Sequence, residues 1–162
     1  RKDKLFHNHM TIEVILPYFD MKSPSFKKLV TEFRIKMFEE VAKSDLDGLI
    51  FTYVWKLDSS NDTYFINTIV NIFERAQATV CYVELEASAE ERLKRNISPN
   101  RLLYKPSKND FDASEKELLE TDREHILNSY LGEFRNKNHL KIINTELNAE
   151  RVAEIIKERF GL

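Results

Sequence analysis

Apolar residues recur along the chain in two patterns that alternate. Short runs of apolar and β-branched residues predict four strands, at residues 4–6, 49–55, 79–85 and 140–143. Between these runs, apolar residues recur every three or four positions, as they do on the buried face of an amphipathic helix. Strands that alternate with helix-length connections favour parallel pairing through right-handed crossovers. The sequence therefore predicts an α/β fold, with three α/β/α layers around one parallel sheet.

Capping side chains support the predicted helices. Ser23 precedes Pro24, the arrangement of an N-cap followed by a first-turn proline. Ser88 stands three residues before Glu91, which is the pattern of a capping box. A further helix is expected at about 113–129. The polar residues expected to cap other helices are Asn61, Asp62 and Asn148.

Two of the predicted strands are almost wholly apolar. Residues 49–55 contain only Thr52 as a polar residue, which is typical of a strand covered on both faces. Cys81, in the strand at 79–85, is expected to pack as a small buried hydrophobe. The phenylalanines at helical spacing are expected in the same core: Phe26, Phe33, Phe38, Phe65 and Phe73. Function in such sheets is expected at the carboxyl ends of the strands.

The composition is that of a globular domain. The 162 residues are enough for one domain, 1–162, with a real core. A net charge of −2 argues against a protein whose whole surface binds nucleic acid. The single cysteine fits a reducing compartment, and no apolar run approaches the length of a membrane span, so we expect a cytoplasmic protein without a membrane partner. Because the chain opens on Arg1, we expect it to be a fragment, a processed product or a chain whose start has been left out.

Positive charge is concentrated in one segment. Residues 92–109 contain six basic side chains and no acidic one: Arg92, Lys94, Arg95, Arg101, Lys105 and Lys108. Such a segment on an otherwise acidic chain predicts a site for a polyanionic ligand, and the alternative is a solvated basic loop. Arg92 and Arg95 lie three positions apart and so share one side of a helix. A guanidinium binds two phosphate oxygens at once, which makes these two residues candidates for phosphate binding.

Three segments resemble P-loop small-molecule kinases. Leu85 to Asn96 resembles the junction at which a strand ends and a capped helix delivers arginines to a mobile lid. Ile142 to Val152 resembles the last strand and C-terminal helix of these kinases, whose connecting loop passes near the adenine. Lys4 to Met10 resembles the second strand and acceptor turn of shikimate-kinase-like ATPases. The order of elements matches along nearly the whole chain.

The resemblance implies an ATP-dependent phosphotransferase with Mg²⁺. It implies a lid at about 96–112, with Arg92 and Arg95 as catalytic residues. It also implies that Arg92, Arg95, Arg101 and Asn144 bind the nucleotide. The residues implied for the acceptor are His7, Asn8, His9, Thr52 and Trp55.

One motif of the resembled family is absent from this sequence. The phosphate-binding loop G-x-x-x-x-G-K-[ST] does not occur, because the only glycines are Gly48, Gly132 and Gly161 and none precedes a lysine. In the family this loop and the central strand come before the segment that opens this chain. We therefore expect that the chain alone does not bind ATP in the family's way, and that its sheet lacks its first strand.

The turn His7-Asn8-His9 has three interpretations. It can receive a phosphoryl acceptor, with hydrogen bonds to hydroxyl groups or a histidine acting as a base. It can be a structural turn, or the two histidines can bind a metal. Shikimate kinases place an aspartate in this region, and this turn has none, so shikimate itself is disfavoured as the acceptor.

Three functions follow from these observations. The first is phosphoryl transfer from ATP to a small hydroxylated or nucleotide-like acceptor. The second is a non-catalytic nucleotide-binding or regulatory module. The third, RNA or nucleotide binding through the basic segment alone, is disfavoured because Tyr104 is the only aromatic residue there.

Overall fold

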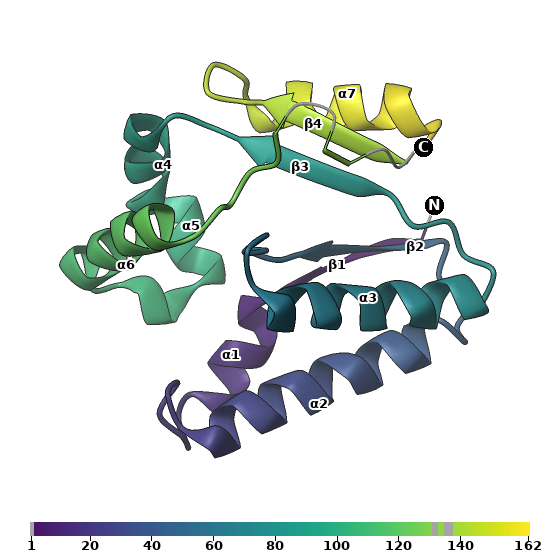
Figure 1. The fold of residues 1–162 in the computed structure, drawn as a ribbon, viewed down its shortest axis with the longest axis horizontal. Helices are drawn as coiled ribbons and strands as arrows, with labels where there is room; N and C mark the ends of the chain where they lie inside the picture. Colours follow the sequence, from purple (N-terminus) through teal and green to yellow (C-terminus); the bar gives the residue numbers. More distant parts are fainter. Residues whose placement is uncertain (1, 131–132, 135–137) are drawn as a thin grey trace.

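The computed structural model describes residues 2–130, 133–134 and 138–162, and its elements alternate between strands and helices (Figure 1). In chain order these are β1 (Asp3–His7), α1 (His9–Ile15), α2 (Pro24–Val41), β2 (Gly48–Thr52), α3 (Ser60–Arg75), β3 (Tyr82–Glu86), α4 (Ala89–Asn96), α5 (Pro99–Tyr104), the 3-10 helix η1 (Pro106–Lys108), α6 (Phe111–Glu124), β4 (His139–Ile143) and α7 (Ala149–Phe160). The predicted α/β class is confirmed.

The four strands form two separate parallel pairs. Leu5 of β1 lies opposite Ile50 of β2, and Leu85 of β3 lies opposite Ile142 of β4. Parallel pairing is therefore confirmed, but the prediction of one sheet is wrong for the described residues, because β2 and β3 do not pair with each other. All four strands run the same way, and their carboxyl ends point toward the side that carries α4, α5 and α6 (Figure 1).

An aromatic core fixes α2 and α3 against the first pair of strands. The Phe38 ring of α2 is fully buried, with its centroid 4.9 Å from that of Phe51 in β2. Phe65 of α3 packs on Phe51 from the same side, at 6.5 Å. The alternate residues of this segment, Ile50 and Val54, are more than half exposed. Because side chains alternate between the faces of a strand, one face is covered and the prediction of cover on both faces is wrong.

Most of the predicted helix starts are confirmed at the level of single hydrogen bonds. The side chain of Ser23 accepts from the Phe26 amide at 3.1 Å, and that of Ser88 accepts from the Glu91 amide at 3.2 Å. Asn148 caps α7 in the same way. The cap of α3 is Ser59, two residues before Asn61 and three before Asp62, because its hydroxyl accepts from the amide of Asp62. The helix expected at 113–129 ends at Glu124.

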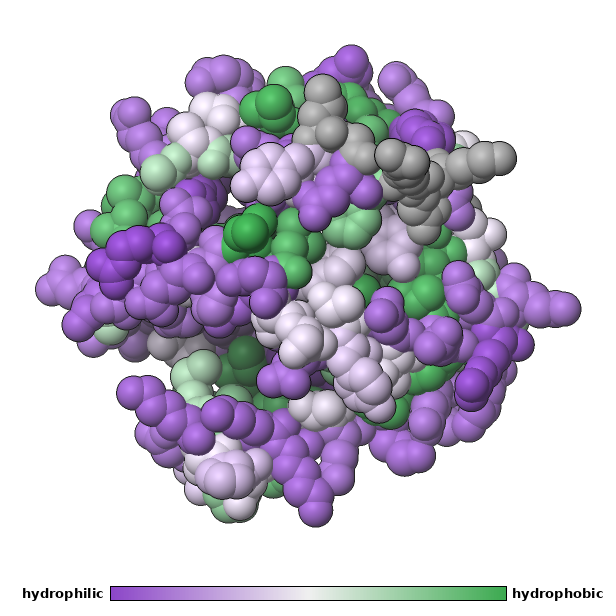
Figure 2. Space-filling view, viewed as in Figure 1, coloured by the Kyte–Doolittle hydropathy of each residue, from purple (hydrophilic) through white to green (hydrophobic). Residues whose placement is uncertain are grey.

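Several apolar side chains remain on the surface. Cys81 is exposed, since it precedes β3 instead of lying within it, so its prediction as a buried residue is wrong. Phe33 is 44% exposed, in contrast to the buried Phe26 and Phe38 of the same helix. Figure 2 shows apolar patches that interrupt the polar surface on one face of the molecule. Among the described residues, no helix combines the length and apolar character that a bilayer crossing requires.

Candidate functional site

The histidine turn, residues 7–9, lies at the carboxyl end of β1 and is held by a buried arginine. Arg34 of α2 donates from Nη2 to the backbone oxygen of Asn8 at 2.7 Å and from Nε to Thr11 Oγ1 at 2.9 Å. Both Arg34 and Thr11 are buried. Burial lowers the pKa of Arg34. The hydrogen-bond acceptors of its guanidinium in the described chain are neutral oxygens and not carboxylates, so no negative charge among them offsets the burial of the cation. The turn is therefore braced by a charged donor on its inner side.

A carboxylate joins the histidine turn to the basic segment. Glu13 Oε1 lies 3.2 Å from His9 Nδ1, and the carboxylate also accepts from the backbone amide and hydroxyl of Ser107 in η1. Burial raises the pKa of Glu13, but the hydrogen bonds from Ser107 and His9 outweigh it and leave that pKa below its usual value. Burial lowers the pKa of His9 to about 4, so at neutral pH its contact with Glu13 is a hydrogen bond from a neutral ring.

The part of the basic segment next to the turn is formed by α5 and η1. Lys108 pairs with Glu117 of α6, and Arg101 donates weakly to the backbone oxygen of Asn96 at 3.4 Å. Lys105 lies between them in sequence and is only partly exposed. Burial, followed by the charges of Arg101 and Lys108, lowers the pKa of Lys105. The segment at 96–112, expected as a lid, therefore carries helices of its own; its mobility stays a prediction.

His7 lies beside this cluster. The residue is 8% exposed, and its Nδ1 is buried with no hydrogen-bond partner in the described part of the chain. Burial lowers the pKa of His7, and the charge of Lys105 lowers it further, while Glu13 opposes the change. The ring of Tyr104 packs edge-on against His7, with centroids 5.9 Å apart. The histidine turn thus presents a neutral imidazole to a positively charged segment.

The arginines predicted as catalytic residues are engaged within the chain. Arg92 Nη2 lies 2.8 Å from Asp122 of α6. Arg95 pairs with Glu91 at 2.7 Å and donates to the backbone oxygen of Asn144 at 2.7 Å. Arg95 and Asn144, both predicted at the nucleotide, are therefore brought together at the carboxyl ends of β3 and β4.

Two further predicted residues lie near the strand ends but make different contacts. Thr52 is the residue opposite His7 in the register of β1 and β2, and it is exposed. Trp55 donates to Thr63 Oγ1 at 3.3 Å, and its ring packs on Phe134 at 5.5 Å. Thr52 is thus placed beside the histidine turn, whereas Trp55 packs toward α3 and Phe134.

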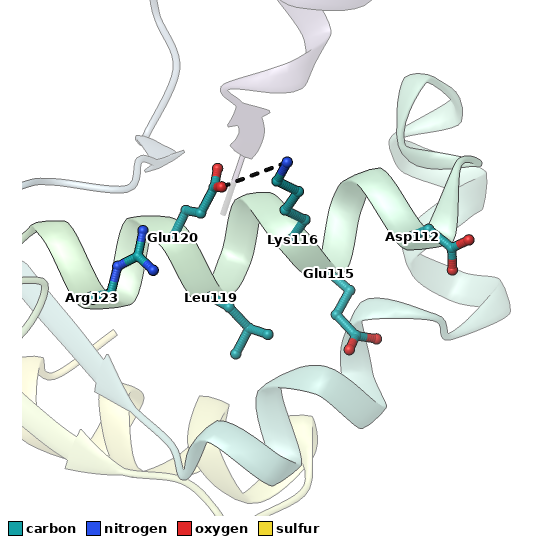
Figure 3. A pocket seen from close by; sticks show the side chains of 6 residues that line it. All are labelled: Asp112, Glu115, Lys116, Leu119, Glu120 and Arg123. Carbon is teal, nitrogen blue, oxygen red and sulfur yellow. Dashed lines mark ion pairs between the residues drawn. The ribbon is translucent and has the colours of Figure 1, made fainter.

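A surface hollow lies on a different part of the molecule. It follows the solvent face of α6 and is lined by Asp112, Glu115, Lys116, Leu119, Glu120 and Arg123 (Figure 3). All of these belong to one helix, and none was predicted as a site residue. Lys116 and Glu120 pair across one turn at 3.9 Å. Within the described ranges, no group of three or more His, Cys, Asp or Glu side chains is arranged to hold a metal ion.

Sequence reasoning missed residues that organise the site. Glu13 and Ser107 are 94 positions apart, and no local pattern links them. Arg34 could have been found from the sequence, because it lies four residues from Val30 and four from Phe38, on the buried face of α2. Lys105 belongs to the basic segment, but arginine is the better phosphate ligand, so the sequence favoured Arg92, Arg95 and Arg101 as site residues.

Comparisons of the chain with protein-family models, curated proteins and solved structures found no match. The resemblance to P-loop small-molecule kinases that the sequence suggested therefore stays a prediction.

Proposed function

We propose that the intact protein is an ATP-dependent phosphotransferase for a small hydroxylated or nucleotide-like acceptor, and that this chain supplies its acceptor turn and its lid. The observation that carries the proposal is the hydrogen bond from the Ser107 hydroxyl to the Glu13 carboxylate, which joins the basic segment to the histidine turn. It brings neutral imidazoles and several cations together at the carboxyl ends of parallel strands, where α/β proteins bind ligands. Phosphoryl transfer depends on such positioning and charge.

The open edges of the two strand pairs also support the proposal. Tyr82 and Glu86 of β3 bond toward the β4 side, through Asn138 and Asn144. In a parallel strand, the backbone groups of the alternate residues, Val83 and Leu85, then point to the other edge. The resembled family has a central strand followed by the phosphate-binding loop, and in the proposal that strand pairs with the edges of β2 and β3 that no described strand occupies.

The test is ATP turnover by the intact protein with a panel of small hydroxylated acceptors and nucleoside monophosphates. We expect acceptor-dependent release of ADP, and none from residues 1–162 alone. Absence of nucleotide binding by the intact protein would refute the kinase proposal. Binding of ATP without turnover on any acceptor would favour the alternative, a non-catalytic nucleotide-binding module, which the engagement of Arg92 and Arg95 within the chain also favours.

The predicted roles of the arginines have their own controls. If Arg92 stabilises the transferring phosphoryl group, Arg92→Ala lowers the rate on the order of 10³-fold and affects nucleotide affinity less. Asp122→Asn removes the partner of Arg92 but keeps the guanidinium, so it should leave the rate nearly unchanged. Arg95→Ala also removes the contact with Asn144, so a loss of stability accompanies any loss of rate. Equal loss in Arg92→Ala and Asp122→Asn would mean that the ion pair acts structurally.

A further inference from the structure

The cations next to the histidine turn are unequally neutralised. Lys108 has Glu117 as a partner, and Arg101 has the backbone oxygen of Asn96. The side chain of Lys105 has neither an ion pair nor a hydrogen bond within the described chain, although it is the member whose pKa is lowered by burial and by both neighbouring cations. A partly buried ammonium between like charges is unfavourable for folding, which is typical of a group placed for a ligand.

A second, independent observation comes from the turn itself. His7 Nδ1 is a buried polar atom without a partner among the residues that the structure describes, and buried polar groups are nearly always hydrogen-bonded in folded proteins. The charge of Lys105 reaches both His7 and His9. The acid facing this group, Glu13, is occupied by Ser107 and His9. Within the described chain, Lys105 and His7 Nδ1 are therefore left without partners beside the turn, and the other buried polar atoms without one are Arg92 Nε and Asn96 Nδ2.

We propose that Lys105 binds an oxyanion, a phosphate or carboxylate group, with His7 as the neighbouring hydrogen-bond donor. The phosphoryl acceptor is then a small molecule that carries a phosphate or carboxylate group, and this part of the inference rests on the proposed function. The bound anion neutralises Lys105, and a rotation of the neutral His7 ring, whose Nδ1 is closed to solvent in this structure, lets that nitrogen donate to the anion. Tyr104, which packs on that ring and is half exposed, forms the outer wall of the site.

The first experiment measures binding of inorganic phosphate, and separately of acetate, to the intact protein without ATP, by titration calorimetry at constant ionic strength. The variant is Lys105→Met, and the matched control is Lys94→Met, an exposed lysine of the same basic run. A charge-assisted hydrogen bond is worth about 1.5–3 kcal/mol, so Lys105→Met should weaken binding roughly 10- to 100-fold. Lys94→Met should bind as the wild type does. Whichever anion shows this loss identifies the group.

Thermal unfolding separates a binding role from a structural one. Without anion, Lys105→Met should unfold at a higher temperature than the wild type, because it removes a partly buried charge that Arg101 and Lys108 disfavour. Added anion should raise the unfolding temperature of the wild type and not that of the variant. Destabilisation by Lys105→Met, or anion binding that survives it, overturns the proposal. If the protein binds the anion but does not turn over ATP, the oxyanion site is supported and the phosphotransferase proposal fails. If it turns over ATP but does not bind the anion, the phosphotransferase proposal is supported and the oxyanion site fails.

Discussion

Arg34 provides a sharp test of how the histidine turn is held. Its guanidinium makes two short hydrogen bonds in a buried environment, to the backbone oxygen of Asn8 and to Thr11. Hydrogen bonds from a charged donor contribute about 1.5–3 kcal/mol each, so the two together give about 3–6 kcal/mol. Part of this is offset by burying a cation that has no carboxylate among those contacts. We therefore expect Arg34→Met, which preserves much of the aliphatic length, to destabilise the protein by about 2 kcal/mol.

The assay is urea unfolding of the protein, followed by far-ultraviolet circular dichroism. Thr11→Val removes the hydroxyl that accepts from Arg34, and the double variant completes a thermodynamic cycle. Residues that share a hydrogen bond should show a coupling energy of about 1 kcal/mol. Lys36→Met, an exposed lysine on the same helix, is the matched control and should change stability by less than about 0.5 kcal/mol. A near-zero effect of Arg34→Met with no coupling to Thr11 would refute the idea that this arginine braces the turn.

Three further predictions concern a helix end and two titrating groups. Gln77 follows α3 with a φ of 60°, a conformation that favours glycine, so Gln77→Gly should stabilise the protein by up to about 1 kcal/mol in urea unfolding, whereas Gln77→Ala should not. Burial raises the pKa of Glu84, but hydrogen bonds from Ser129 and Asn128 outweigh it and hold that pKa at about 2; its stabilising contribution is therefore complete above about pH 4.5 and is lost as the pH falls toward 2. Glu84→Gln should flatten the pH dependence of the unfolding free energy in that window, and an unchanged slope would contradict this. Burial lowers the pKa of His9 to about 4, so between pH 6.5 and pH 4 the unfolded chain binds a proton at this residue that the folded protein does not. The free energy of unfolding should therefore fall as the pH drops through this window. The fall should be less steep in His9→Gln.

Local patterns predicted the helices better than they predicted the sheet. A capping serine acts within four residues, so the starts at Ser23 and Ser88 could be read directly from the sequence. The length of a strand depends on its neighbours, and the run at 49–55 ends as a strand at Thr52, where its pairing with β1 stops. An apolar run also cannot say which of its faces a helix will cover. For this reason Ile50 and Val54 were expected inside and are exposed.

The site was predictable in position but not in its contacts. The carboxyl end of the first strand and the basic run were both identified from sequence, and the structure places them together. Which basic residues are neutralised depends on acids that are distant in sequence, such as Asp122 for Arg92 and Glu117 for Lys108. Helical spacing favoured Arg92 and Arg95 because both lie on one side of α4, yet that side faces partners within the protein. That Lys105 has no side-chain partner in the described part of the chain could be learned only from the structure.

Oxyanion binding and ATP binding require different parts of the protein, and the edge of β3 links the two. Oxyanion binding needs only the turn, α5 and η1, all of which are tied together through Glu13. Binding of ATP in the manner of the resembled kinases also needs a phosphate-binding loop at the carboxyl edge, between the two strand pairs. On the side of β3 that faces away from β4, the Leu85 carbonyl accepts from the Asn128 side chain at 3.2 Å. A central strand paired along β3 would compete for that carbonyl, so nucleotide binding and the position of the segment after α6 should be coupled.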